Sequence, residues 1–283
     1  MSGLVAALDP RGFLGQYVKQ GIRQDSRTLS EARALSISAN PFVATGDAGP
    51  VVVGSSMVQM GATRMCCSVT LQVGTPSAMS PDRGDFDMDV TLGALCSASY
   101  DQRGKPDDAY ELEMLLETVL KRKCAILDLG ELCIEPEKSA FQLNVSIICL
   151  SADGNIQDAA LLAAVAALQN TRLPEAVVDS TTGQVQISRD ASKSRFLPLR
   201  CLPVPVTVGL VSGELLLDPT LSEQQGLDGL LRCVVLEDGS LCHMAQSDFT
   251  GEGLTMADLG RAVEWCHKAA GEVRSTLGRA RAR

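Results

Sequence analysis

The ten consecutive residues Ala159-Ala160-Leu161-Leu162-Ala163-Ala164-Val165-Ala166-Ala167-Leu168 contain no polar side chain. A helix that is apolar on every side must be covered on every side, so this run predicts a central helix. Its alanines would allow neighbouring backbones to approach closely. The run is also much shorter than the roughly 20 residues that a membrane-spanning helix needs. We therefore expect a folded domain built around residues 159–168, and no membrane span.

The segments before this run carry strand and helix patterns. From Gln142 to Ile147, polar and apolar residues alternate, which is the period of a strand with one buried face. Further upstream, apolar residues recur at helical spacing from Leu112 to Leu120. Asp108 lies three residues before Glu111, which is the spacing of a capping box and predicts where that helix begins.

Strands followed by a helix occur twice along the chain. The first half has β-like segments that precede the helices described above, and the second half has β-like segments followed by a helix that starts near Thr255. The β-like segments are 51–59, 65–73, 204–211, 215–217, 231–236 and 241–244. We predict an α+β fold in one domain, residues 1–270, with two similar lobes joined near 176–194.

Charge limits the kinds of partner that the chain can bind as a whole. Lys and Arg number 25 and Asp and Glu number 34, so the net charge is −9. The chain is therefore not a polycation, and contact with nucleic acid would need a local basic patch. Residues 271–283 contain Arg274, Arg279, Arg281 and Arg283. We predict that this segment is a basic, partly disordered tail that adds non-specific affinity for phosphate groups.

The cysteine pattern argues against a disulfide framework and against a metal site. The ten cysteines contain no CxxC pair, and most of them lie in apolar stretches. We therefore expect reduced thiols in an intracellular protein. A structural zinc site needs two close pairs of ligands. Only Cys242-His243 and Cys266-His267 come near this pattern, and adjacent side chains generally point apart. We predict neither a bound metal nor a cofactor.

Two other kinds of site follow from the residues alone. His243 and His267 are the only histidines, and neither belongs to a serine or cysteine arrangement typical of a catalytic triad. Asp85, Asp87 and Asp89 would share one face of a strand at intervals of about 7 Å. Such a face could bind a divalent cation, or it could be a solvated edge whose charges prevent unwanted strand pairing. We favour the solvated edge, and the cation site stays open as an alternative.

Several local strings together resemble the RNase PH family. The opening Arg23-x-Asp25-x-Arg27, followed by Glu31 and Arg33, is similar to the RxDGR…ExR opening of that family, with Ser26 where glycine is usual. The strings 132–140 and 147–159 look like those of the non-catalytic RNase-PH-like subunits of the eukaryotic RNA exosome ring. Within that group, 169–175 is most similar to the subunit type called exosome complex component eight.

The resemblance implies a fold, partners and a location. The expected fold has two βαβ-type lobes packed around central helices, which agrees with the duplication described above. Family members of this kind assemble with other RNase-PH-like subunits into a hexameric ring around an RNA channel. RNA-binding cap subunits sit on one face of the ring, and an exoribonuclease associates with it. The corresponding locations are the nucleus, the nucleolus and the cytoplasm.

The resemblance also implies where catalytic groups would lie. Active members degrade RNA from the 3′ end with inorganic phosphate as the nucleophile, which they bind on a Gly-Ser/Thr-Arg turn at the start of the central helix. The matching positions here are Asn155, Ile156 and Gln157, and Asp158 adds a carboxylate that would repel phosphate. Cys201 matches the position of the general-acid aspartate. We predict a degenerate site and a structural subunit; an active phosphorolytic exoribonuclease is the alternative.

Two residues are candidates for direct contact with RNA. Arg103 and Lys105 lie where related ring subunits present basic residues toward the RNA path. Tyr100 precedes them, so the segment could offer two cations and an aromatic ring to a nucleic acid. The resemblance therefore implies that this chain lines the channel and supports RNA processing and degradation by the assembly.

Overall fold

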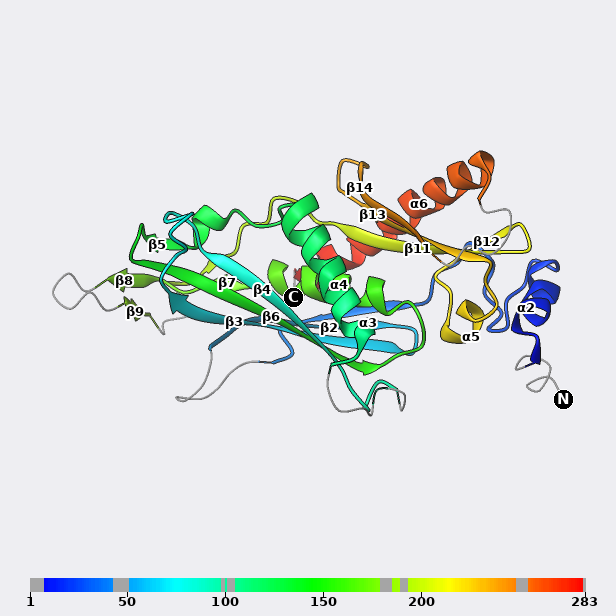
Figure 1. Cartoon of the computed structure of the whole chain (residues 1–283), viewed down its shortest axis with the longest axis horizontal. Helices are drawn as coiled ribbons and strands as arrows, with labels where there is room; N and C mark the ends of the chain where they lie inside the picture. Colours follow the sequence, from blue (N-terminus) through cyan, green and yellow to red (C-terminus); the bar gives the residue numbers. More distant parts are fainter. Residues whose placement is uncertain are drawn as a thin grey trace.

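The computed structural model describes residues 8–42, 51–97, 100, 105–178, 185–188, 193–247 and 254–281. Figure 1 shows an elongated molecule with a large sheet toward one end and a smaller sheet toward the other. Helix α4 (Ile156–Gln169) packs against strands of both sheets. Within the described residues, no helix combines the length and the apolar character that crossing a membrane requires.

The large sheet belongs to the first lobe and contains one βαβ unit. Its strands run in the order β1-β2-β3-β6-β4, and β5 pairs with β6. Strand β4 is parallel to β6 and forms the edge, whereas the other pairs are antiparallel. The connection from β4 to β6 passes through helix α3, the π-helical segment η2 and the short 3-10 helix η3. The bounds are β1 (Leu35–Ala39), β2 (Val51–Met60), β3 (Thr63–Gly74), β4 (Asp85–Leu92), α3 (Asp107–Leu116), η2 (Glu117–Lys123), η3 (Leu129–Leu132), β5 (Cys133–Glu135) and β6 (Ser139–Ser151).

The smaller sheet belongs to the second lobe. Its strands run in the order β12-β11-β13-β14 and are antiparallel throughout. Helix α6 packs on β11 and β13 and also reaches β1 of the first lobe. Helix α2 contacts this lobe through Leu14 and Val18. The bounds are α2 (Pro10–Val18), β11 (Val204–Val211), β12 (Glu214–Leu217), α5 (Leu221–Gln224), β13 (Gly229–Val235), β14 (Leu241–Ser247) and α6 (Met256–Arg281). Two small pairs complete the described strands: β7 (Arg172–Leu173) with β10 (Arg195–Phe196), and β8 (Ala176–Val178) with β9 (Val185–Ile187).

Helix α4 has the buried, central position that its composition predicts. Every residue from Asp158 to Gln169 is buried. Strand β2 crosses the helix closely, because Ser56 donates its hydroxyl hydrogen to the carbonyl oxygen of Ala163 at 2.7 Å. Small side chains on the helix permit this approach, as expected from its alanines. The alternation from Gln142 to Ile147 is likewise confirmed, since β6 buries its odd-numbered residues there.

Two buried ion pairs attach the N-terminal segment to the second lobe. The guanidinium of Arg23 donates to Glu223, with Nε 2.8 Å from Oε1, and that of Arg33 donates to Asp218, with Nη2 2.7 Å from Oδ1. Arg27 binds the more exposed Asp25 at 2.6 Å. Arg23 and Arg33 of the RNase PH-like opening therefore act here as structural links between the N-terminal segment and the second lobe.

The predicted capping box at Asp108 is wrong. Helix α3 begins after Pro106, whose fixed φ places the chain in an extended conformation before the first turn, and no side chain caps the helix. Asp108 instead accepts a hydrogen bond from the hydroxyl of Tyr100 at 2.6 Å. A proline at the boundary has taken the role that the sequence pattern assigned to the aspartate.

The described part of the predicted basic tail is helical, not disordered. Helix α6 continues to Arg281, because Leu277 and Ala280 are buried and extend its apolar stripe beyond residue 270. The guanidinium of Arg274 donates to the carbonyl oxygen of Val235, 3.1 Å away, and so binds the end of β13. Residues 282–283 lie outside the described residues.

Candidate functional site

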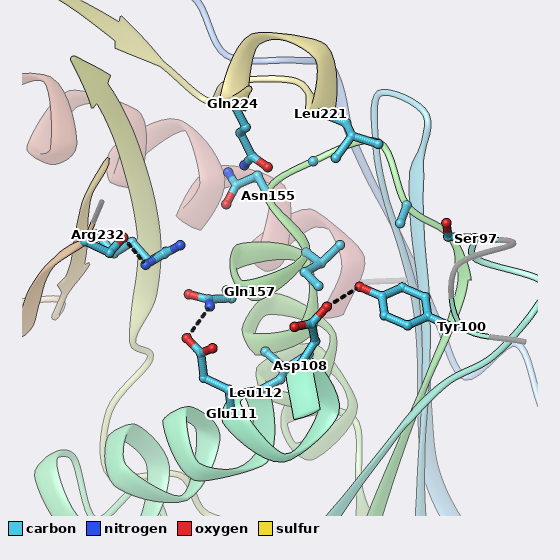
Figure 2. Close-up of a pocket in the computed structure, with 14 residues that line it drawn as sticks. Ser97, Tyr100, Asp108, Glu111, Leu112, Asn155, Gln157, Leu221, Gln224 and Arg232 are labelled. Atoms are coloured by element: carbon cyan, nitrogen blue, oxygen red, sulfur yellow. Dashed lines mark hydrogen bonds between the residues drawn. The ribbon is translucent and has the colours of Figure 1, made fainter. Parts of the chain in front are cut away.

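A cavity of about 460 Å³ opens at the amino end of α4, where the two lobes meet. Residues from α3, α4, α5, β13 and β14 line it together with the segment around Ser97 and Tyr100 (Figure 2). The predicted degenerate phosphate site lies here, because Asn155, Ile156 and Gln157 all belong to the lining. The structure therefore brings these three residues together with Arg232 of the second lobe, which the sequence alone did not single out.

The turn that leads into α4 is held by contacts on its inner side. Gly154 and Asn155 both have left-handed backbone conformations, with φ values of 75° and 52°. A Cβ atom at Gly154 would lie 2.4 Å from the backbone nitrogen of Leu221, so only glycine fits between the lobes. The side-chain nitrogen of Asn155 donates to Asp158 at 2.8 Å and to Asp218 at 2.9 Å. Both amide hydrogens are thus used within the protein, and neither is left for a ligand.

Asp158 is a buried carboxyl group just behind the cavity wall. One of its oxygens accepts from the hydroxyl of Thr207 at 2.9 Å, and the other accepts from Asn155. Burial raises the pKa of Asp158 to about 6, even though these hydrogen bonds lower it. Asp158 lies in the first turn of α4. When it is ionised, its carboxylate interacts favourably with the positive end of the helix dipole.

The charged groups on the cavity wall already have partners (Figure 2). Asp108 accepts from the Tyr100 hydroxyl at 2.6 Å, and Glu111 accepts from the side chain of Gln157 at 3.4 Å. Arg232 donates to the hydroxyl of Ser247 at 2.8 Å. Burial and the Asp108 carboxylate together raise the pKa of Tyr100, so its hydroxyl stays protonated.

Among the described residues, the cavity wall carries more acidic than basic groups. Its lining residues include two carboxylates, from Asp108 and Glu111, and one guanidinium, from Arg232. At neutral pH their formal charges sum to −1, whereas orthophosphate is itself an anion. The other polar groups of the described lining are neutral: the amides of Asn155, Gln157 and Gln224 and the hydroxyls of Ser97, Tyr100 and Ser247. The described wall can therefore donate hydrogen bonds to a polar group and accept hydrogen bonds from it.

The structure does not place Cys201 at this cavity. Its thiol lies near the opposite end of α4, in a second cavity of about 370 Å³ that is also lined by Gln169, the last residue of the helix. The Sγ atom of Cys201 is 3.6 Å from the carbonyl oxygen of Cys124. The match of Cys201 to the general-acid position is therefore wrong, because this residue does not lie near Asn155, Ile156 and Gln157. Matching a position by sequence could not show which end of the central helix the segment before β11 reaches.

The acidic face of β4 is a solvated edge, as favoured from the sequence. Asp85, Asp87 and Asp89 project from the edge strand of the large sheet, with side chains 63%, 77% and 55% exposed. Lys121 pairs with Asp85 and Asp87, at 3.7 and 2.9 Å. Among the residues that the structure describes, no group of three or more potential ligands is arranged to hold a metal ion. The alternative of a cation site on this face is not supported.

Of the two candidate RNA contacts, the structure describes Lys105. Arg103 lies outside the described residues. Lys105 binds Asp89 at 2.9 Å, forms an ion pair with Glu113 and sits over the ring of Tyr110. The hydrogen bonds and charges of Glu113 and Asp89 raise the pKa of the Lys105 ammonium, although burial opposes the change. Its charge is already largely balanced within the protein.

A second cationic feature was missed by the sequence analysis. The guanidinium carbons of Arg172 and Arg281 lie 4.3 and 5.7 Å from the centre of the Phe196 ring. The ring is 42% exposed. Nearby Arg195 and Arg200 each pair with a carboxylate, those of Glu131 and Asp128. Arg281 reaches this ring because helix α6 continues to residue 281. The sequence analysis assumed a partly disordered tail and therefore could not predict the contact.

Two lobes of strands and helices enclosing a central apolar helix, with a polar cavity at its amino end, define an RNase PH-like fold. Comparison with known families agrees. The model described as 3′ exoribonuclease family, domain 1, matches residues 31–174, and the model for domain 2 of the same family matches residues 201–269. This chain belongs to the RNase PH, or 3′ exoribonuclease, family.

Several relatives of this chain are archaeal exosome components. Exosome complex component Rrp42 of Thermococcus onnurineus (strain NA1) is 30% identical over 268 residues, which cover 94% of this chain and 93% of the relative. The Rrp42 component of Methanothermobacter thermautotrophicus is 34% identical over 243 residues, covering 85% of this chain and 84% of the relative. Both alignments span the two lobes.

Solved structures with the same fold include chains of archaeal exosomes. A chain from the Archaeoglobus fulgidus exosome with RNA bound to the active site superposes with a TM-score of 0.79 and 27% identity, covering 97% of this chain and 99% of the other. A chain of an archaeal exosome core gives a TM-score of 0.75 and 25% identity, with 98% of both chains covered. The similarity therefore extends over the whole fold.

Proposed function

We propose that this chain is a structural subunit of an exosome-type hexameric ring and has no phosphorolytic activity of its own. In this role it lines the RNA channel and supports 3′-to-5′ RNA processing and degradation by the complex. The single observation that carries the proposal is the amino end of α4. There the positions matching the family's phosphate-binding turn are Asn155, Ile156 and Gln157, beside two carboxylates and one guanidinium.

The energetic consequence of this replacement can be estimated. A charge-assisted hydrogen bond contributes roughly 1.5–3 kcal/mol, so loss of the arginine contact alone weakens phosphate binding about ten- to a hundredfold. The Asn155 amide cannot compensate, because it donates to Asp158 and Asp218. The Glu111 carboxylate, which accepts from Gln157, adds repulsion. These terms act in the same direction, against a bound phosphate nucleophile.

The test is a phosphorolysis assay on the purified chain. An end-labelled oligoribonucleotide is incubated with and without orthophosphate, and nucleoside diphosphates are measured. We expect no phosphate-dependent release. Phosphate-dependent release that Gln157→Ala abolishes would support the alternative, an active phosphorolytic exoribonuclease. Cys201→Ala is the matched control, because Cys201 lies at the other end of α4 and should leave any activity at this cavity unchanged.

The proposed partners are those of a ring subunit: other RNase-PH-like subunits, RNA-binding cap subunits and an associated exoribonuclease. The support is that the relatives are exosome components and that the similar chains come from exosome assemblies. We further propose the nucleus, nucleolus and cytoplasm as locations, and exosome complex component eight as the ring type. Isolation of the tagged chain from cells, with stoichiometric measurement of the co-purifying subunits, tests these assignments. Recovery of the chain without RNase-PH-like partners would contradict them.

We propose that RNA contacts come from Arg103 and Lys105 and from the stack formed by Arg172 and Arg281 on Phe196. The support for the stack is that, within the described residues, neither arginine forms an ion pair with a carboxylate, although the chain carries a net charge of −9. Two guanidinium groups near one ring repel each other, and an anionic phosphodiester would relieve that repulsion. Lys105 contributes less, because Asp89 and Glu113 already balance its charge.

The RNA proposal is tested on the assembled ring. Arg103→Glu and Arg172→Ala should each lower RNA affinity without dissociating the ring. For a single-stranded RNA, each lost phosphate contact should reduce the slope of log K against log salt by about 0.7. Arg195→Ala is the control, because Glu131 already pairs with Arg195 at 2.7 Å. Unchanged binding at several salt concentrations would exclude the altered residue from the RNA path.

A further inference from the structure

Three cysteines from distant parts of the sequence meet at a contact between the lobes. Cys124 directly follows η2, Cys242 lies in β14, and Cys201 precedes β11. The Sγ atoms of Cys124 and Cys242 are 3.3 Å apart, although 118 residues separate them in the sequence. All three cysteines are half-buried residues, whereas six of the other seven cysteines are buried.

The close pair is chemically asymmetric. The thiol of Cys124 donates a hydrogen bond to the sulfur of Cys242. This bond, with help from the Lys123 ammonium and despite burial, lowers the pKa of Cys242 below that of an ordinary thiol. The same bond raises the pKa of Cys124, and burial adds to the effect. Because the thiolate is the reactive form of cysteine, Cys242 is the nucleophile of the pair and Cys124 is its neutral neighbour.

Exposure distinguishes this pair from the other cysteine pairs of the chain. Cys233 and Cys266 also share a hydrogen bond, but they are 1% and 0% exposed in the core. Cys96 and Cys149 are 8% and 1% exposed. A dissolved oxidant can reach a thiol only where its sulfur is accessible. The pair formed by Cys124 and Cys242 is therefore the one expected to react in the folded protein.

We propose that Cys124 and Cys242 form a redox-modification site, at which a small-molecule disulfide such as glutathione disulfide converts the two thiols into a covalent link between the lobes. Closing the link requires the sulfur atoms to move from 3.3 Å to about 2.05 Å apart. The linked residues would fasten η2 of the first lobe to β14 of the second. This inference does not depend on the proposed role in RNA degradation.

The reaction is two successive thiol–disulfide exchanges. The thiolate of Cys242 attacks one sulfur of glutathione disulfide, forming a mixed disulfide and releasing one glutathione thiolate. Cys124 then loses its proton to the released thiolate and attacks the Sγ of Cys242. That step forms the bond between the two protein sulfurs and releases the second glutathione, which takes up the proton lost by Cys242. The protein is oxidised by two electrons, and the oxidant is reduced to two thiols.

The test uses the full chain, reduced and then incubated with glutathione disulfide in its folded state. The number of free thiols, counted after denaturation, should fall from ten to eight. Mass spectrometry of a tryptic digest should find the peptide 124–138 joined to the peptide 233–261. The melting temperature should rise on oxidation and return to its starting value after reduction with dithiothreitol, because the link constrains the unfolded chain.

Matched variants identify the sulfur atoms. Cys124→Ser and Cys242→Ser should each abolish the joined peptides, and Cys124→Ser should leave at most one glutathione on Cys242. Cys133→Ser should still form the link, although Cys133 is half-buried and shares its tryptic peptide with Cys124. Absence of the joined peptides from the fully oxidised wild-type chain would overturn the proposal, and that readout needs no variant to fold. Their persistence in both Cys124→Ser and Cys242→Ser would overturn it equally.

Discussion

Arg33 and Asp218 lie 185 residues apart and form a buried, two-pronged ion pair, with Nε 2.9 Å from Oδ2 and Nη2 2.7 Å from Oδ1. The backbone nitrogen of Arg33 also donates to Oδ2, and the side chain of Asn155 donates to Oδ1. Asp218 therefore connects the N-terminal segment, the second lobe and the start of α4. The amino end of the central helix is held in place from behind by this carboxylate.

Replacing Asp218 with alanine should strongly destabilise the fold, because it leaves the buried guanidinium of Arg33 without its partner. Loss of one member of a buried pair costs about 3–5 kcal/mol. Burial raises the pKa of Asp218, but the hydrogen bonds and charge of Arg33 more than offset it, so the pKa lies below 3.8. The difference between wild type and variant should therefore be complete at neutral pH and shrink as the pH falls below about 4.

Urea unfolding at several pH values measures this difference. Asp25→Ala is the control, because Asp25 binds Arg27 in a pair whose carboxylate is 40% exposed. Exposed pairs contribute up to about 1 kcal/mol, so this variant should change stability little. If Asp218→Ala and Asp25→Ala have similar free energies of unfolding, Asp218 does not connect the lobes as described.

Asp158 should make the protein less stable as the pH rises. Its pKa is about 6 in the folded protein, compared with 3.8 for an unperturbed aspartate, so the folded state binds the proton more tightly. The favourable contribution of the protonated group is complete below about pH 4 and is lost as the pH rises through about 6. The two pKa values differ by an amount that corresponds to about 3 kcal/mol.

Comparison with Asp158→Asn isolates this contribution, because asparagine does not titrate and can still bond to Thr207 and Asn155. The stability of the variant relative to wild type should increase between pH 4.5 and pH 7.5 in urea unfolding. Asp82→Asn, at a carboxylate that is 70% exposed, controls for a general effect of losing a negative charge. A relative stability of Asp158→Asn that does not change with pH would show that Asp158 titrates normally.

Gly54 should not tolerate a side chain. A Cβ atom there would lie 2.8 Å from the Cα of Thr171 and 2.9 Å from the carbonyl oxygen of Ala167, where β2 crosses the end of α4. Because both neighbours are backbone atoms, Gly54→Ala should destabilise the protein by about 1–3 kcal/mol. Gly271→Ala should stabilise it by about 0.5–1 kcal/mol, since Gly271 lies within α6 and its Cβ would meet no atom within 4 Å. Thermal unfolding of both variants tests this contrast, and equal shifts would contradict it.

Helices and strands could be predicted from the sequence where the residue pattern fits one secondary structure and one buried face. The run 159–168 has no polar face, so only a helix covered on all sides satisfies it, and α4 is such a helix. The alternation around Val145 likewise permits one orientation, with the odd-numbered residues buried in β6. In both cases local sequence and global packing favour the same answer.

Features that depend on contacts beyond the local residue pattern could not be predicted. Asp108 has the spacing of a helix cap, but the structure provides Pro106 as the boundary and Tyr100 as the partner. The charges on Asp85 and Asp87 are balanced by Lys121, more than thirty residues away. Sequence matching placed Asn155 and Gln157 correctly at the amino end of α4. It misplaced Cys201, because the path of the chain before β11 determines which end of the helix that residue reaches.

Orthophosphate should not stabilise the wild-type chain, since the described lining of the cavity at the start of α4 has two carboxylates and one guanidinium. A folded protein that bound phosphate with a Kd of about 1 mM would gain about 1.4 kcal/mol in about 10 mM phosphate, which raises the melting temperature by about 3 °C. We expect no rise beyond that in sodium chloride of equal ionic strength. Gln157→Arg supplies a second guanidinium and should create a phosphate-dependent rise, whereas Cys201→Arg, at the other end of the helix, should not. A phosphate-dependent rise in the wild-type chain would show that the amino end of α4 still binds the anion, and would remove the basis for a purely structural role.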